Sequence, residues 1–64
     1  MASEERFPVV RRLLERHGWV LARISSSHHV FKKPGAPDVS IPVHHGKVKP
    51  FYVRQVKKLI EEGR

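Results

Sequence analysis

The chain has 64 residues, with 13 lysines and arginines against 6 acidic residues, which gives a formal net charge of +7 when the histidines are neutral. A chain this short forms one domain, expected over residues 1–64, and buries only about 60% of the surface that it exposes when unfolded. The absence of cysteine excludes disulfides and thiolate metal sites. No apolar run is long enough for a membrane span or a signal peptide, which favours a soluble, cytoplasmic protein. The positive charge is spread through segments that look ordered, and therefore predicts a folded surface for a polyanion, either nucleic acid or an acidic protein.

The first predicted element is a helix over residues 4–17. Ser3 is its expected N-cap, and Glu4 and Glu5 then stand in the first turn, where the helix dipole favours acidic groups. Gly18 is the expected stop. The apolar stripe recurs at helical spacing and ends with a histidine that is expected to be partly buried: Val10, Leu13, Leu14 and His17.

Three strands are predicted next, over residues 19–24, 28–33 and 39–43. Strict alternation in the first strand gives two faces, one with Val20, Ala22 and Ile24 and the other with Trp19, Leu21 and Arg23. Serines at 25–27 and the Pro-Gly-Ala-Pro sequence at 34–37 mark the two turns. Pro42 lacks an amide donor, so the third strand is expected at an edge of the sheet.

The His-His-Gly-Lys segment at 44–47 is an expected loop, and Pro50 then starts a second helix that Gly63 ends. Its apolar stripe consists of Val53, Val56, Leu59 and Ile60. Strands joined by short turns pair antiparallel, and two amphipathic helices can cover one face of such a sheet. The predicted class is therefore α+β, in the order α-β-β-β-α, with both helices packed on one face of a three-stranded antiparallel sheet.

Two adjacent histidines, His28 and His29, open the predicted middle strand, after three serines and before two lysines. Neighbouring residues of a strand point to opposite faces, so His28 shares a face with Val30, and His29 shares one with Phe31. If Val30 packs against the helices, His29 lies on the open face. If Phe31 packs against them, His28 lies there instead. The sequence leaves both alternatives open.

Several short motifs, each present once, follow one another over about residues 7–63. They are His17-Gly18-Trp19, Ser27-His28-His29-Val30-Phe31, Val39-Ser40-Ile41-Pro42-Val43-His44, Gly46-Lys47 and Lys49-Pro50. Together they resemble the HicA family, the small mRNA-cleaving toxins (mRNA interferases) of type II toxin–antitoxin pairs. The resemblance implies a fold like the double-stranded-RNA-binding domain (dsRBD), a metal-independent endoribonuclease activity on mRNA, and neutralisation by a HicB-type antitoxin. The chain departs from the family pattern twice. Ser26 replaces the glycine of the family's Gly-Ser-His, and Phe51-Tyr52-Val53 replaces Gly-Thr-Leu at the start of the last helix.

The family's catalytic histidine corresponds to His28, whereas simple alternation with a buried Val30 favours His29, so both are catalytic candidates. Imidazole titrates near neutral pH, and it can take a proton from a ribose 2′-hydroxyl and also return one. A cation near the phosphate completes such a site. The candidates for contacts with RNA are Lys32, Lys33, His44, Lys47 and Lys49. Histidines adjacent in a strand do not easily share one ion, so no metal and no other cofactor is expected.

The alternative function is a non-catalytic RNA-binding module of the same fold. A third class is a protein-interaction domain whose basic surface meets an acidic partner, such as an antitoxin. Trp19 and Tyr52 are single aromatic residues, and we expect both to pack at the edge of the core rather than to stack on bases.

Overall fold

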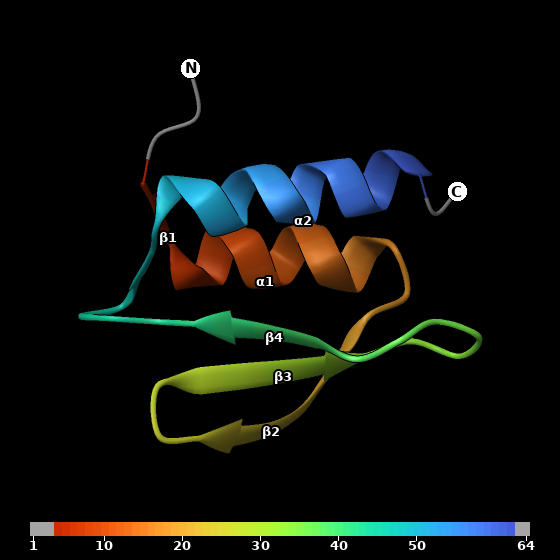
Figure 1. The fold of residues 1–64 in the computed structure, drawn as a ribbon, viewed down its shortest axis with the longest axis horizontal. Coiled ribbons are helices and arrows are strands. Elements are labelled where there is room, and N and C mark those ends of the chain that lie inside the picture. Colours follow the sequence, from red (N-terminus) through yellow and green to blue (C-terminus); the bar gives the residue numbers. More distant parts are fainter. Residues whose placement is uncertain (1–3, 63–64) are drawn as a thin grey trace.

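The computed structural model describes residues 4–62 (Figure 1). The elements along the chain are β1 (Glu5–Arg6), α1 (Phe7–Arg16), β2 (Val20–Ser25), β3 (His28–Lys32), β4 (Val39–Pro42), β5 (Lys47–Val48) and α2 (Pro50–Glu62). The predicted α-β-β-β-α order is confirmed, and a short antiparallel pair of β1 with β5 is added to it. Neither helix is long and apolar enough, over the residues described, to cross a membrane. The expected N-cap Ser3 and the expected helix stop Gly63 lie outside the described residues.

The main sheet has the strand order β2-β3-β4, and both neighbouring pairs are antiparallel. The strand that begins with the two histidines is therefore the central one. β4 is an edge strand, as Pro42 predicted, because a proline interrupts a ladder of hydrogen bonds least where one side of the strand is unpaired.

Helix α1 begins at Phe7 rather than at residue 4. The preceding segment Glu5–Arg6 is extended, because it pairs with Lys47–Val48 of β5. Pro8 then lies in the first turn of the helix, where its missing amide costs no intrahelical hydrogen bond. The prediction that acidic residues occupy this first turn was therefore wrong, since strand pairing takes that segment away from the helix.

The other end of α1 closes as predicted, at Gly18, whose φ of 89° lies in the left-handed region that favours glycine. The Gly18 amide donates to the carbonyl of Glu15 (3.2 Å), and the Trp19 amide donates to the carbonyl of Leu14 (3.1 Å). This is a Schellman motif, and it directs Trp19 into the core, where the side chain is 4% exposed. His17 was expected to be partly buried. It is exposed, because it is the C-cap residue, at which the chain leaves the helix.

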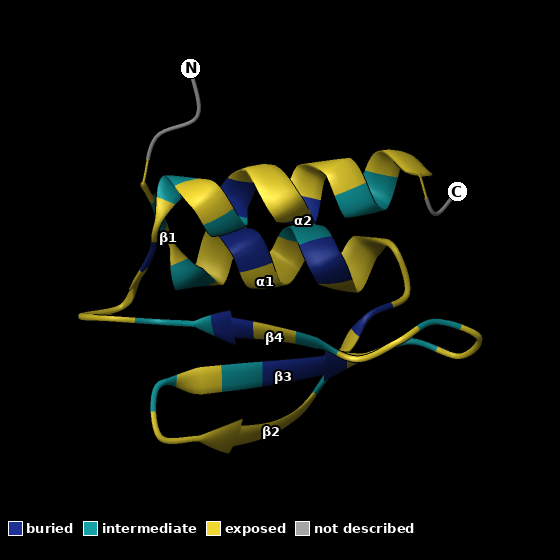
Figure 2. Ribbon diagram, in the orientation of Figure 1, coloured by how far each residue is buried: buried dark blue, intermediate teal, exposed yellow. Residues whose placement is uncertain are grey.

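One hydrophobic core lies between the two helices and one face of the sheet (Figure 2). Phe31 of β3 and Ile41 of β4 are 0% and 1% exposed. The predicted apolar stripes of both helices pack on them through the buried residues Val10, Leu14, Val53 and Val56, and Tyr52 packs at the edge of the same core. Both helices therefore cover the Phe31 face of the sheet and leave the opposite face open.

Strand β2 contains a β-bulge between Leu21 and Arg23 that strict alternation did not predict. Leu21 is paired with Phe31 and Arg23 with Val30, so Ala22 is an extra residue that has no partner on β3. The predicted face with both Leu21 and Arg23 was therefore wrong. Leu21 packs toward the core, and Arg23 lies on the open face.

The turn from β2 to β3 holds Ser26 at a φ of 57°, in the left-handed region. The family resemblance described above implies a glycine at this position. A side chain with a Cβ costs roughly 1–2 kcal/mol in this conformation. The neighbouring Ser27 is not among the residues with positive φ.

We predict that Ser26→Gly raises the free energy of unfolding by about 0.5–1 kcal/mol, because the conformational relief exceeds the extra entropy that glycine gives the unfolded chain. Urea denaturation followed by circular dichroism measures this. Ser27→Gly is the matched control and should lower the stability by a similar amount, since no positive φ is relieved there. A Ser26→Gly variant that loses stability as Ser27→Gly does would contradict the prediction.

Candidate functional site

His28 lies on the open face of the sheet, at the first position of β3. It is paired with Ser25 of β2 on one side and with Pro42 of β4 on the other. Its side chain is exposed, and a hydrogen bond of 3.4 Å joins its Nδ1 to the hydroxyl of Ser40. Ser40 thus orients the imidazole from the neighbouring strand and leaves Nε2 available to a ligand.

His29 lies on the opposite face, toward the helices. Its ring packs against the ring of Phe7 with centroids 4.4 Å apart, and its Nδ1 donates to the carbonyl of Ser27 at 3.3 Å. Phe31 shares this face and is fully buried in the core. Val30, on the His28 face, is also only 7% exposed but lies outside the core cluster. The structure therefore shows the arrangement in which Phe31 packs inward and His28 is on the open face.

The β2–β3 turn and the loop after β4 are joined at the His28 end of the sheet. The Val43 amide donates to the carbonyl of Ser27 at 2.7 Å. The Phe7 amide, at the start of α1, donates to the carbonyl of Gly46 at 2.8 Å. These two bonds bring together the turn, the loop and the beginning of a helix, and the start of α2 lies at the same end of the molecule (Figure 1).

Three of the predicted RNA-binding residues, His44, Lys47 and Lys49, lie at this end of the molecule. His44 and Lys47 exchange two backbone hydrogen bonds of 3.0 and 2.9 Å across a tight turn. The ammonium of Lys47 is 3.8 Å from the carboxylate of Glu4, and both side chains are about half exposed, so this pair holds the lysine only weakly. The helix N-termini at the same end add partial positive charge. A basic surface thus extends from the His28 end of the sheet toward the helices.

Lys32 and Lys33 lie at the other end of β3. Lys32 lies four positions along the strand from His28, which corresponds to about 13 Å. The ammonium of Lys32 is 3.4 Å from the carboxylate of Asp38. The ammonium of Lys33 lies over the Trp19 ring, 5.9 Å from its centroid. The structure therefore does not bring these two predicted RNA-binding residues together with the histidine.

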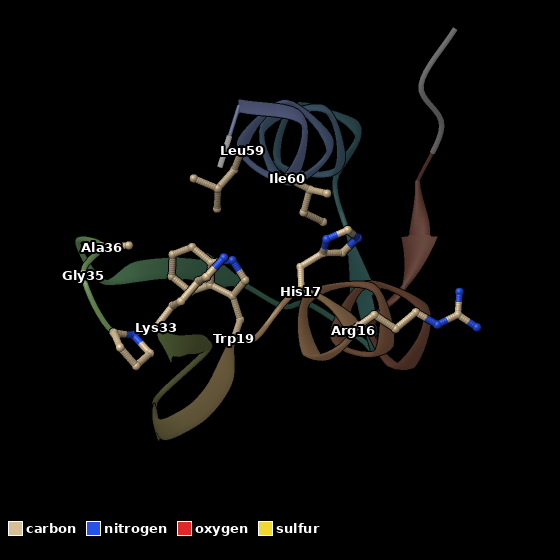
Figure 3. Close-up of a pocket in the computed structure, with 9 residues that line it drawn as sticks. Arg16, His17, Trp19, Lys33, Gly35, Ala36, Leu59 and Ile60 are labelled. Atoms are coloured by element: carbon tan, nitrogen blue, oxygen red, sulfur yellow. The ribbon is translucent and has the colours of Figure 1, made fainter. Parts of the chain in front are cut away.

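A cavity of about 520 Å³ lies at this far end, between the C-terminal ends of the helices and the loop after β3 (Figure 3). The imidazole of His17 and the indole of Trp19 line it from opposite sides, and Leu59 and Ile60 of α2 close it from above in this view. The cavity is separate from the open face on which His28 lies.

Within residues 4–62, no three histidine, aspartate or glutamate side chains gather closely enough to hold a metal ion. The chemical groups that the open face does present are an imidazole, a hydroxyl and cations. One of these cations, Arg23, was not among the predicted site residues. Strict alternation predicts that Arg23 shares a face with Leu21. No sequence signal marks the bulge that moves Arg23 to the open face.

We predict that His29→Ala lowers the free energy of unfolding by about 1–2 kcal/mol, because it removes an aromatic contact and a partly buried hydrogen bond. His28→Ala should change it by less than about 0.5 kcal/mol, since that side chain is exposed. Urea midpoints at unchanged slope give both values. Equal losses for the two variants would contradict the assignment of the two histidines to different faces.

A family model described as the HicA toxin of bacterial toxin–antitoxin systems matches residues 9–61. The search of curated proteins gave no match, and neither did the search of solved structures. The matched residues extend from α1 to α2 and include the whole three-stranded sheet with both histidines of β3. This chain therefore belongs to the HicA family of toxins from bacterial toxin–antitoxin systems.

Proposed function

We propose that this toxin is a metal-independent endoribonuclease that cleaves mRNA in the cytoplasm, and that His28 is its acid–base group. The observation that carries the proposal is the position of His28. It is an exposed imidazole on a sheet face free of helices, oriented by Ser40 at 3.4 Å and next to a basic loop. RNA can reach such a face without any opening of the fold. His29 packs against Phe7 and serves the structure instead.

In the proposed reaction, neutral His28 accepts the proton of a ribose 2′-hydroxyl. The 2′ oxygen attacks the adjacent phosphorus, and the bond from phosphorus to the 5′ oxygen breaks. The leaving 5′ oxygen takes a proton from the imidazolium or from water. One fragment then ends in a 2′,3′-cyclic phosphate, or in a 3′-phosphate after hydrolysis, and the other begins with a 5′-hydroxyl. Because the bond from phosphorus to the 5′ oxygen is the one that breaks, the phosphorus stays on the 3′ end of the upstream fragment, and a 5′-phosphate on the downstream fragment is incompatible with this route.

The basic loop would contribute binding energy. Lys49 lies just before α2, so its charge adds to the partial positive charge at the start of that helix. Phosphate contacts of this kind position RNA without reading its sequence.

The same positive surface suits an antitoxin with acidic groups. We propose a HicB-type protein as the partner of this toxin, since membership in the toxin family implies an antitoxin. An antitoxin that covers the open face would block access to His28 without altering the core.

We predict that His28→Ala lowers the rate of RNA cleavage at least about 100-fold, the usual contribution of a general acid–base group. Purified variants are assayed on a labelled RNA, and the termini of the products are identified. His29→Phe is the matched control, because it keeps a ring against Phe7 but cannot carry protons, and it should cleave at a rate near that of the parent.

The same assay distinguishes the alternative functions. Loss of cleavage in His29→Phe but not in His28→Ala would assign the chemistry to the other histidine. Binding of RNA by the parent without any cleavage would favour a non-catalytic RNA-binding module. A parent protein that neither binds nor cleaves RNA would favour a protein-interaction domain.

We also predict that Lys49→Gln weakens RNA binding to a similar degree for all RNA sequences. The slope of log K against log salt should become less negative by about 0.7, as expected when one contact to a single strand is lost. The measurement uses the His28→Ala background, in which RNA stays intact. Lys57→Gln, an exposed lysine of α2 with the same change in charge, should leave the slope unchanged. Equal slopes for both variants would remove Lys49 from the RNA surface.

A further inference from the structure

The β-bulge in β2 brings a cation onto the same face as His28. Arg23 is paired with Val30, and Val30 is paired with Ser40 on the other side. These three residues therefore form one row across the open face. His28 lies on the same face, two residues before Val30 along β3. Without the bulge, Arg23 would point toward the helices.

The burial of Val30 indicates where the Arg23 side chain lies. Val30 is 7% exposed although both helices pack on the other face of the sheet. Its neighbours on the open face are Arg23 and Ser40 across the sheet and His28 and Lys32 along β3. The aliphatic stem of Arg23 is the longest apolar group among its direct partners, because Ser40 is short. With its stem over Val30, Arg23 would hold its guanidinium close to the plane of the open face.

Arg23 is exposed and has no acidic partner in the described part of the chain, where every ion pair involves other basic residues. Lys32, the other cation on this face, is paired with Asp38 at 3.4 Å and is about 13 Å along the strand from His28. Diagonal cross-strand neighbours such as Arg23 and His28 are roughly 7–8 Å apart, within the reach of a long side chain. Arg23 is thus the unpaired cation nearest to the imidazole along the sheet.

We propose that Arg23 binds the scissile phosphate beside His28 and is a catalytic residue of the RNA cleavage. This inference rests on the proposed ribonuclease function. The guanidinium offers two parallel N–H donors to the two non-bridging oxygens of the phosphate, and it remains protonated throughout the reaction. As the 2′ oxygen attacks, negative charge builds up on those oxygens, and the fixed cation stabilises it. Ser40 orients the imidazole from β4, and Arg23 holds the phosphate from β2.

The test compares Arg23→Gln and Arg23→Lys with Arg54→Gln, an exposed arginine of α2 that lies away from the open face. Steady-state cleavage of a short labelled RNA gives kcat and KM for each variant. We expect Arg23→Gln to lower kcat about 100-fold or more, as does the loss of one oxyanion donor, with a much smaller change in KM. Arg23→Lys keeps the positive charge and an aliphatic stem beside Val30 but loses the bidentate contact with the phosphate, so its kcat should be intermediate. Arg54→Gln should resemble the parent.

Urea midpoints of the same variants show whether folding is affected. Should Arg23→Gln be unfolded, Arg23→Lys still decides, because it retains the cover over Val30. A kcat for Arg23→Lys equal to that of the parent, together with folded and fully active Arg23→Gln, would overturn the proposal while His28-dependent cleavage stands. A large rise in KM at unchanged kcat would also overturn it, since Arg23 would then only bind RNA. Absence of cleavage by the parent would overturn the ribonuclease function and this inference with it.

Discussion

Burial of Phe31 at the centre of the sheet is the constraint on which the other features depend. Phe31 is 0% exposed and belongs to one core cluster with residues of both helices and of β4, so its removal would leave a cavity that costs several kcal/mol. Because side chains alternate along a strand, an inward Phe31 fixes an inward His29 and an outward His28. The packing of one aromatic residue thus decides which imidazole meets solvent and which one supports the start of α1.

The surface on which function is proposed is shaped by backbone irregularities rather than by a deep pocket. A bulge at Ala22 places Arg23 on the open face of the sheet. Ser26, in the left-handed backbone conformation, closes the turn that precedes His28. The large cavity lies at the opposite end of the molecule, beside Trp19. Nucleic acids are long and need an accessible, positively charged face more than an enclosed one, so an open sheet suits RNA better than that cavity does.

The cations near β3 fall into two groups, one at the His28 end of the sheet and one at the far end of the strand. The loop after β4 and the start of α2 concentrate positive charge at the His28 end, where no carboxylate competes strongly. At the far end of β3, Lys32 is held by Asp38, and Lys33 lies over an indole ring. The Lys32–Asp38 pair is about half exposed, as is the Lys47–Glu4 pair at the other end, so both pairs hold their lysines only weakly. The number of cations close to His28 is therefore smaller than the net charge of the chain suggests.

The sequence by itself determined the order of the elements, the apolar stripes of both helices, the edge position of β4 and the stop at Gly18. These features arise from local periodicity, from the missing amide of proline and from the conformational freedom of glycine. The pair of histidines and the family motifs also identified the strand that carries the candidate site. Only the tertiary structure decided the facing of His28, because Val30 and Phe31 are both apolar and a period of two fits either arrangement. It likewise decided the pairing of β1 with β5, which is too short to show any pattern, and the bulge that places Arg23 on the open face. Those features depend on contacts between distant segments, and such contacts leave no periodic mark in the chain.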